Sequence, residues 1–194
     1  MTNCDPPHGR GPQRRTVLVT GLGLGLAPWL TNAVCADDPT TLAPQPGDRF
    51  AFLTGEKKGQ VVKVDDLPFG GPQVQAYPLD PTTGVVRNGS RLNLIVLIRL
   101  DPSSLSEEIR ARAAEDVVAY SAVCTHQGCP VIMWANEQNA LVCSCHASVF
   151  DPRNGAQVLA GPAPRSLPSL GLKLEDGVPV VAAAFSGHVG PITH

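Results

Sequence analysis

The sequence lacks an excess of charge of either sign. Lys and Arg number 15 against 17 Asp and Glu, so the formal net charge of the 194 residues is −2. This balance argues against a nucleic-acid binder, which needs a basic face to neutralise phosphates. A hydrophobic fraction of 43% with a mean hydropathy of +0.02 excludes a disordered chain and one that crosses a membrane many times.

Aromatic residues are also scarce, at 5%, whereas Gly and Pro number 19 each. This composition favours many short elements joined by turns over long helices, and we expect an all-β, antiparallel domain. Apolar runs and turn residues predict strands at 49–54, 60–64, 94–100, 117–123, 170–175 and 178–184. One inserted helix is predicted at 107–115, because Ser104 and Glu107 form a capping-box pattern. Residues 65–90, rich in Pro and Gly, are expected to be irregular.

Residues 1–36 have the pattern of an export signal or membrane anchor. The pair Arg14-Arg15 precedes an uncharged stretch at 16–36 that is long enough to cross a bilayer. Such a pair is typical of twin-arginine signals, although an ordinary buried helix is the alternative. We therefore expect an exported protein that is periplasmic, or anchored in the membrane and facing the periplasm. Residues 37–46 contain three prolines and are predicted to be a linker, followed by one folded domain at 47–194.

Four of the six cysteines lie within 23 residues, together with two histidines. They form the patterns Cys124-Thr-His126-Gln-Gly-Cys129 and Cys143-Ser-Cys145-His146. A site that draws equally on both patterns is Cys2His2, and one cysteine of each pattern is then left over. Three interpretations compete: a structural zinc site, disulfides with incidental histidines, and a [2Fe–2S] cluster in which two histidines replace two cysteines at one iron. Zinc-finger spacings differ from these, and disulfides alone leave both histidines unexplained.

The two patterns resemble the paired motif of Rieske iron–sulfur proteins, C-T-H-x-G-C and C-x-C-H-x-S, over 124–148. The resemblance implies a Rieske-like antiparallel β-sandwich with a small cluster-binding subdomain at about 120–167 and a [2Fe–2S] cofactor. It implies that Cys124 and Cys143 bind one iron and that His126 and His146 bind the other. It further implies a disulfide between Cys129 and Cys145.

Four more residues are assigned through the same resemblance. Gly161 and Pro162 begin a stretch that is similar to the proline-rich loop that shields the cluster, and Ser148 occupies the place of a hydroxyl donor to a cluster sulfur. Phe150 stands where quinol-oxidising members commonly carry a tyrosine. The absent hydroxyl implies a lower reduction potential. Residues 148–151 also resemble the small subunit of arsenite oxidase more than the quinol-oxidising subunit.

The resemblance implies a one-electron carrier without a catalytic site of its own. Two parent complexes remain open: a quinol–cytochrome c oxidoreductase, and a periplasmic molybdenum oxidase of the arsenite oxidase type. The implied partner is accordingly cytochrome c, cytochrome b or a molybdopterin subunit, with a quinol as a further candidate.

Overall fold

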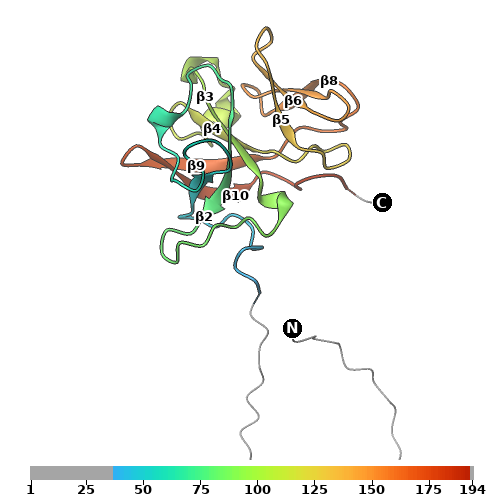
Figure 1. The fold of residues 1–194 in the computed structure, drawn as a ribbon. Coiled ribbons are helices and arrows are strands. Elements are labelled where there is room, and N and C mark those ends of the chain that lie inside the picture. Colours follow the sequence, from blue (N-terminus) through green and yellow to red (C-terminus); the bar gives the residue numbers. More distant parts are fainter. Residues whose placement is uncertain (1–36, 193–194) are drawn as a thin grey trace, which may run out of the picture. The chain divides into compact units, whose positions relative to one another are not determined.

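The computed structural model describes residues 37–192, so the expected export segment at 1–36 lies outside the described residues. Ten strands of the described part form two antiparallel sheets, as Figure 1 shows. The strands are β1 Arg49–Phe52, β2 Val74–Leu79, β3 Ile95–Arg99, β4 Val117–Ser121, β5 Val131–Ala135, β6 Ala140–Cys143, β7 Val149–Asp151, β8 Gln157–Ala160, β9 Ser169–Glu175 and β10 Val178–Phe185. The short helices are η1 Val64–Asp66, η2 Arg91–Asn93, η3 Pro102–Ser104 and α1 Glu107–Arg110. The all-β prediction is confirmed.

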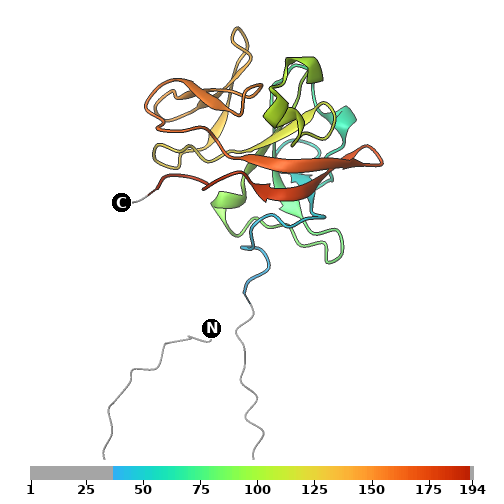
Figure 2. The ribbon, with the colours of Figure 1, turned by 180° about the vertical axis from the view of Figure 1, so that it is seen from behind.

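The larger sheet has the order β1-β2-β3-β4-β9-β10, and its two ends meet. Gly47 N–H donates to the Val181 carbonyl, and Val181 N–H donates to the Asp48 carbonyl, both at 2.9 Å. These bonds join the start of β1 to β10 and satisfy backbone groups that an open edge would expose. The smaller sheet, β5-β6-β7-β8, lies beside it, as the view from behind in Figure 2 shows.

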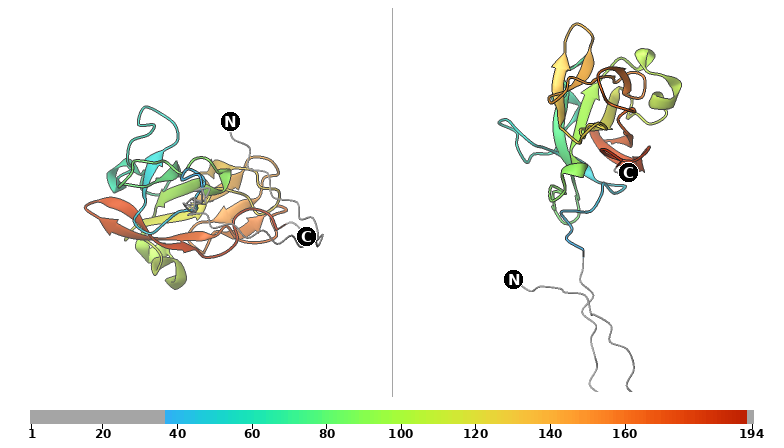
Figure 3. Two further views of the ribbon diagram at one scale, coloured as in Figure 1. Left: turned by 90° about the horizontal axis from the view of Figure 1, so that it is seen from below. Right: turned by 90° about the vertical axis from the view of Figure 1, so that its right-hand side faces the viewer.

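Strands β3 and β4 are buried on both faces, which explains why each is an almost continuous apolar run. Alternate side chains point to opposite faces: Ile95 and Leu97 enter the core of the larger sheet, whereas Val96 and Ile98 enter a second core. The second core also contains Leu141 of β6, so the smaller sheet is fixed to the larger one by apolar packing. The views in Figure 3 show the two sheets from below and from the side.

The predicted helix at 107–115 is wrong in extent. The α-helix covers Glu107–Arg110 only, and its N-cap is Ser106, whose hydroxyl accepts from Ile109 N–H at 3.4 Å. Beyond it, Ala114 and Val117 exchange backbone hydrogen bonds around Glu115, which adopts φ 56°. A left-handed residue cannot continue a helix, so the chain turns here and enters β4.

Two strand predictions also need correction. Residues 60–64 contribute a single bridge, between Ala51 and Val61, and 65–90 contain a six-residue strand, β2. β2 pairs with both β1 and β3, and this tertiary pairing overrides the local turn composition. Its pairing with β3 ends at Ala76, two residues before Pro78, which has no N–H to donate. The hairpin of β9 and β10 has the expected tight turn, with positive φ at Asp176 and Gly177.

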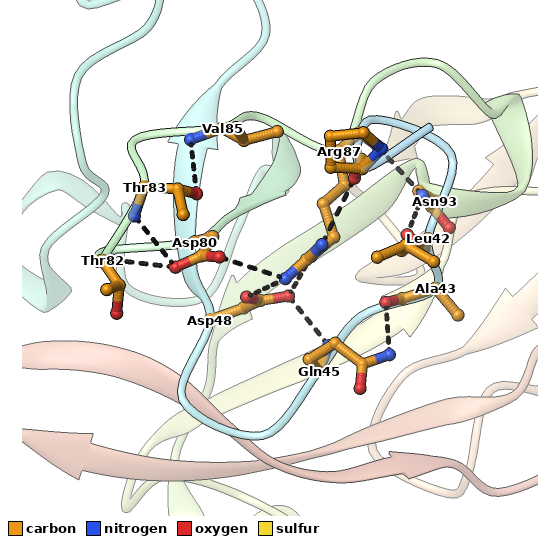
Figure 4. A network of polar contacts seen from close by, with 11 residues as sticks. Leu42, Ala43, Gln45, Asp48, Asp80, Thr82, Thr83, Val85, Arg87 and Asn93 are labelled. Atoms are coloured by element: carbon orange, nitrogen blue, oxygen red, sulfur yellow. Dashed lines mark hydrogen bonds and ion pairs between the residues drawn. The ribbon is translucent and has the colours of Figure 1, made fainter. Parts of the chain in front are cut away.

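Residues 38–45, inside the expected linker, are hydrogen-bonded to the domain (Figure 4). The buried Arg87 guanidinium donates to both Asp48 oxygens, at 2.7 and 3.0 Å, and to the Pro39 carbonyl at 3.3 Å. Asn93 Nδ2 donates to the Leu42 carbonyl at 2.7 Å. Within residues 37–192, no helix is long and apolar enough to cross a membrane.

Candidate metal centre

Two loops at one end of the smaller sheet, one before β5 and one between β6 and β7, carry the predicted ligands. The first loop, 124–129, connects β4 to β5 and is folded by hydrogen bonds between Cys124 N–H and the Cys129 carbonyl and between Gly128 N–H and the Cys124 carbonyl. The second loop, 143–148, connects β6 to β7 and is closed by a bond from Cys143 N–H to the Ser148 carbonyl at 2.9 Å. The first loop thus joins the two sheets, whereas the second is the turn of a hairpin in the smaller sheet.

A disulfide ties the two loops to each other. It joins Cys129 to Cys145, the pair that the resemblance implied, with a Cα–Cα distance of 6.2 Å. The bond links the end of the first loop to the middle of the second, and therefore limits how far the two loops can separate.

The other two cysteines of the patterns are free thiols in the core. Cys124 and Cys143 are 1% and 2% exposed, and both belong to the same buried apolar cluster. Burial raises the pKa of Cys124, while the N–H of His126 and the hydroxyl of Ser148 act in the opposite direction through hydrogen bonds to its sulfur. A buried thiolate pair needs a compensating cation, and a bound metal ion supplies one.

The two imidazoles form a second pair nearer the surface. The rings of His126 and His146 are edge to face, with centroids 4.8 Å apart, and His146 is exposed. Nδ1 of His126 is buried and lacks a hydrogen-bond partner, which is unusual for a buried polar atom. Among residues 37–192 no three metal-binding side chains form one group. Two pairs match a binuclear cluster, in which each iron takes two protein ligands.

The stretch 161–165 covers the two loops. Gly161 has φ +90°, and a Cβ there would lie 2.5 Å from Ser148 Cα, so only glycine allows this approach. The Ser148 hydroxyl accepts from Ala163 N–H at 3.1 Å, and Pro162 is exposed. The Arg165 carbonyl accepts from the Thr125 hydroxyl at 2.6 Å, a contact that we did not predict from the sequence.

Phe150 and Tyr120 support the site from the core. Phe150 of β7 is fully buried in the same apolar cluster as Cys124 and Cys143. Tyr120 of β4 is also fully buried, and its hydroxyl donates to the Pro152 carbonyl at 2.7 Å. This hydrogen bond joins the two sheets. The sequence gives no indication of it, because the partner is a backbone atom 32 residues away.

Comparison with known families decides what this arrangement belongs to. The sequence model described as "Rieske [2Fe-2S] domain" matches residues 57–171, more than half of the 194 residues. The chain belongs to the Rieske [2Fe–2S] domain family. A Rieske domain implies a [2Fe–2S] cluster, and the loops described above provide a donor set that fits one.

Similar proteins include Rieske subunits of more than one named complex. The chain is 37% identical over 99 residues to the cytochrome bc1 complex Rieske iron-sulfur subunit of Streptomyces lividans, covering 50% of this chain and 58% of that protein. It is 34% identical over 124 residues to a putative respiratory nitrate reductase subunit Rieske of Haloferax mediterranei. This match covers 62% of this chain and 52% of that protein. The matches therefore span less than two thirds of each of these relatives.

A solved structure is also similar to this chain. The plasma membrane Rieske protein PetC3 from Synechocystis PCC 6803 is 23% identical, with a TM-score of 0.36, and the match covers 56% of this chain and 86% of that one.

Proposed function

We propose that this chain is a one-electron carrier whose [2Fe–2S] cluster is held by the two free thiols and the two imidazoles. Cys124 and Cys143 would bind one iron, and His126 and His146 the other. The observation that carries this assignment is the separation into a buried thiol pair and an outer imidazole pair within loops joined by a disulfide. Nδ1 of His126, buried and without a partner, gives one of the donor atoms.

A cluster with two imidazole ligands supplies one-electron redox chemistry, at potentials of roughly −150 to +300 mV. The residues of this chain set where and how that chemistry occurs. The core around Cys124 and Cys143 keeps water from the thiolates, and the fully buried Ser148 acts to lower the pKa of the Cys124 thiol. His146 is exposed, so it presents that side of the site to a docking protein.

We propose that the parent assembly is an exported or membrane-attached respiratory complex of the bc1 type. The relative from Streptomyces lividans supports this choice. Its partners would be cytochrome b and cytochrome c, with quinol as the electron donor. A Rieske subunit of a molybdenum oxidase is the second candidate, favoured by Phe150 and by a similar Rieske subunit that belongs to a putative nitrate reductase. Purification of the tagged full chain from its own membranes distinguishes them by the subunit that accompanies it.

A redox titration of the purified full chain tests the electron-carrier function. We expect a one-electron transition within the potential range given above, and loss of that transition in Cys143→Ser, which removes one of the inner ligands. A protein that binds zinc and shows no redox transition would overturn the proposal.

A further inference from the structure

The end of the described chain returns to the first loop. Residues 186–192, which we call the C-terminal strap, follow β10 and lie beside the loop between β4 and β5 in both Figures 1 and 2. Gly190 is buried, and a Cβ there would lie 3.3 Å from Val123, the residue before Cys124. Pro191 lies over buried Gly128, where an added Cβ would be 3.3 Å from its ring.

Ser186 fixes the start of the strap by exchanging hydrogen bonds with Ser169, and Arg165 holds the rest of it. Arg165 donates from Nη1 to the His188 carbonyl at 2.7 Å and from Nη2 to the Gly190 carbonyl. The backbone carbonyl of Arg165 accepts a hydrogen bond from the Thr125 hydroxyl. Arg165 thus contacts the strap through its guanidinium and the first loop through its backbone. Two nitrogens of the planar guanidinium donate to two different carbonyls. A lysine has only one nitrogen and cannot make both hydrogen bonds in this geometry.

We propose that Arg165 is a positioning residue for the metal centre: it fixes the C-terminal strap against the loop 124–129, and the strap keeps water from that side of the site. The inference rests on the proposed function for its consequence, which is protection of the bound cluster. Strap and loop form a cover that is separate from the stretch 161–164, because they meet at Val123 and Gly128 rather than at Ser148.

The loop 124–129 carries two of the proposed ligands, so its exposure to water bears on the metal centre. The loop begins at Cys124, which is 1% exposed, and the strap contacts the residue before it, Val123, and Gly128 near the end of the loop. Thr125 is fixed by the Arg165 carbonyl, so movement of Arg165 also releases the residue between the two predicted ligands of this loop.

The test is hydrogen exchange of the full chain, combined with the rate at which a chelator bleaches the cluster. Arg165→Gln removes both strap bonds. Since one hydrogen bond from a charged group is lost at each of two carbonyls, we expect exchange of strap and loop 124–129 amides to rise by more than about tenfold. Exchange in the loop 143–148 should stay unchanged, which a general loss of stability would not allow. Bleaching should accelerate in parallel.

Three further chains sharpen the result. Arg153→Gln is the matched control, because Arg153 also donates to a backbone carbonyl, that of Gln138, and does not touch the strap. Arg165→Lys keeps the positive charge but loses the planar guanidinium with its two donor nitrogens, and we expect it to behave like Arg165→Gln. A chain ending at Gly187 keeps Arg165 and removes the part of the strap that Arg165 binds, from His188 onward, so its loop should also exchange faster. This chain tests the same claim if Arg165→Gln does not fold.

The possible failures can be told apart. If Arg165→Gln behaves like Arg153→Gln, or if the shortened chain keeps normal exchange and bleaching, the strap is not a cover and the inference is overturned. If Arg165→Lys shows wild-type exchange and bleaching, the positive charge and not the paired hydrogen bonds of the guanidinium is responsible. That result would also overturn the inference. A wild-type chain that binds no cluster would overturn the proposed function, while the exchange measurements would still decide the role of Arg165.

Discussion

Ser148 hydrogen-bonds through its hydroxyl to the stretch that covers the proposed inner ligands, Cys124 and Cys143. This hydroxyl accepts from Ala163 N–H, which fixes the covering stretch, and it acts to lower the pKa of the Cys124 thiol. A hydrogen bond to a cluster sulfur stabilises the more negative, reduced state and therefore raises the potential.

We expect Ser148→Ala to lower the midpoint potential by about 40 mV, because one hydrogen bond is worth on the order of 1 kcal/mol and the couple transfers one electron. Ser144→Ala is the control: Ser144 lies in the same loop, but its hydroxyl donates to the Pro130 carbonyl. Potentiometry with visible absorption measures both variants. Equal potentials in the two variants would show that the Ser148 hydroxyl does not act on a sulfur.

Phe150 provides the opposite test. Its ring is fully buried in the core that contains both free cysteines, and it has no hydroxyl. We expect Phe150→Tyr to raise the potential by tens of millivolts, since one more hydrogen bond to sulfur adds about 1 kcal/mol. Phe50→Tyr, equally buried but in the other core, should leave the potential unchanged. A Phe150→Tyr protein with an ordered ring and the wild-type potential would contradict the assigned position.

At the scale of elements, the two loops act as a unit because a disulfide joins them. Cys129→Ser removes the cross-link from loops that otherwise depend on short turns and on the stretch 161–165. We expect this variant to take up some cluster, with a lower potential and a shorter cluster lifetime. Cys145→Ser breaks the same bond and should match it. Wild-type potential and lifetime in both variants would remove the assigned role of the pair.

What could be predicted from the sequence depended on how local the signal was. The Cys129–Cys145 disulfide and the Asp176-Gly177 turn were predicted from short, self-contained patterns, and the structure has both. β2 was missed because its pairing partners, β1 and β3, lie elsewhere in the chain. The helix was predicted too long because the turn at Glu115 is imposed by the entry into β4. The contacts of Arg165 join segments that are far apart in the sequence, and no local pattern indicates them.

The whole domain depends on the contact between its two sheets, and the Tyr120 hydroxyl bridges them. Burial raises the pKa of Tyr120, so the folded protein keeps this hydroxyl protonated when an unfolded tyrosine ionises, near pH 10. The unfolded chain then binds fewer protons than the folded one. The contribution of Tyr120 to stability is therefore complete below about pH 10 and is lost as the pH rises further.

We expect Tyr120→Phe to lower the free energy of unfolding by about 1–3 kcal/mol at neutral pH, because the buried Pro152 carbonyl loses its donor. The difference in unfolding free energy between the variant and the wild type should shrink above about pH 10. There only the wild type loses stability, because its folded state keeps Tyr120 protonated. Denaturation followed by circular dichroism at pH 7 and in the alkaline range measures this, with Tyr77→Phe on β2 as the control. A difference that does not vary with pH would contradict the role of the buried hydroxyl.

The central claim is that His126 and His146 bind one iron of a [2Fe–2S] cluster, and pulsed EPR of the reduced full chain tests it most directly. In protein labelled with nitrogen-15 at histidine, we predict hyperfine couplings from two ligand nitrogens. One should disappear in His126→Cys and the other in His146→Cys, whereas His188→Gln should retain both. The absence of a paramagnetic signal after reduction, or couplings that persist unchanged in both cysteine variants, would contradict the account.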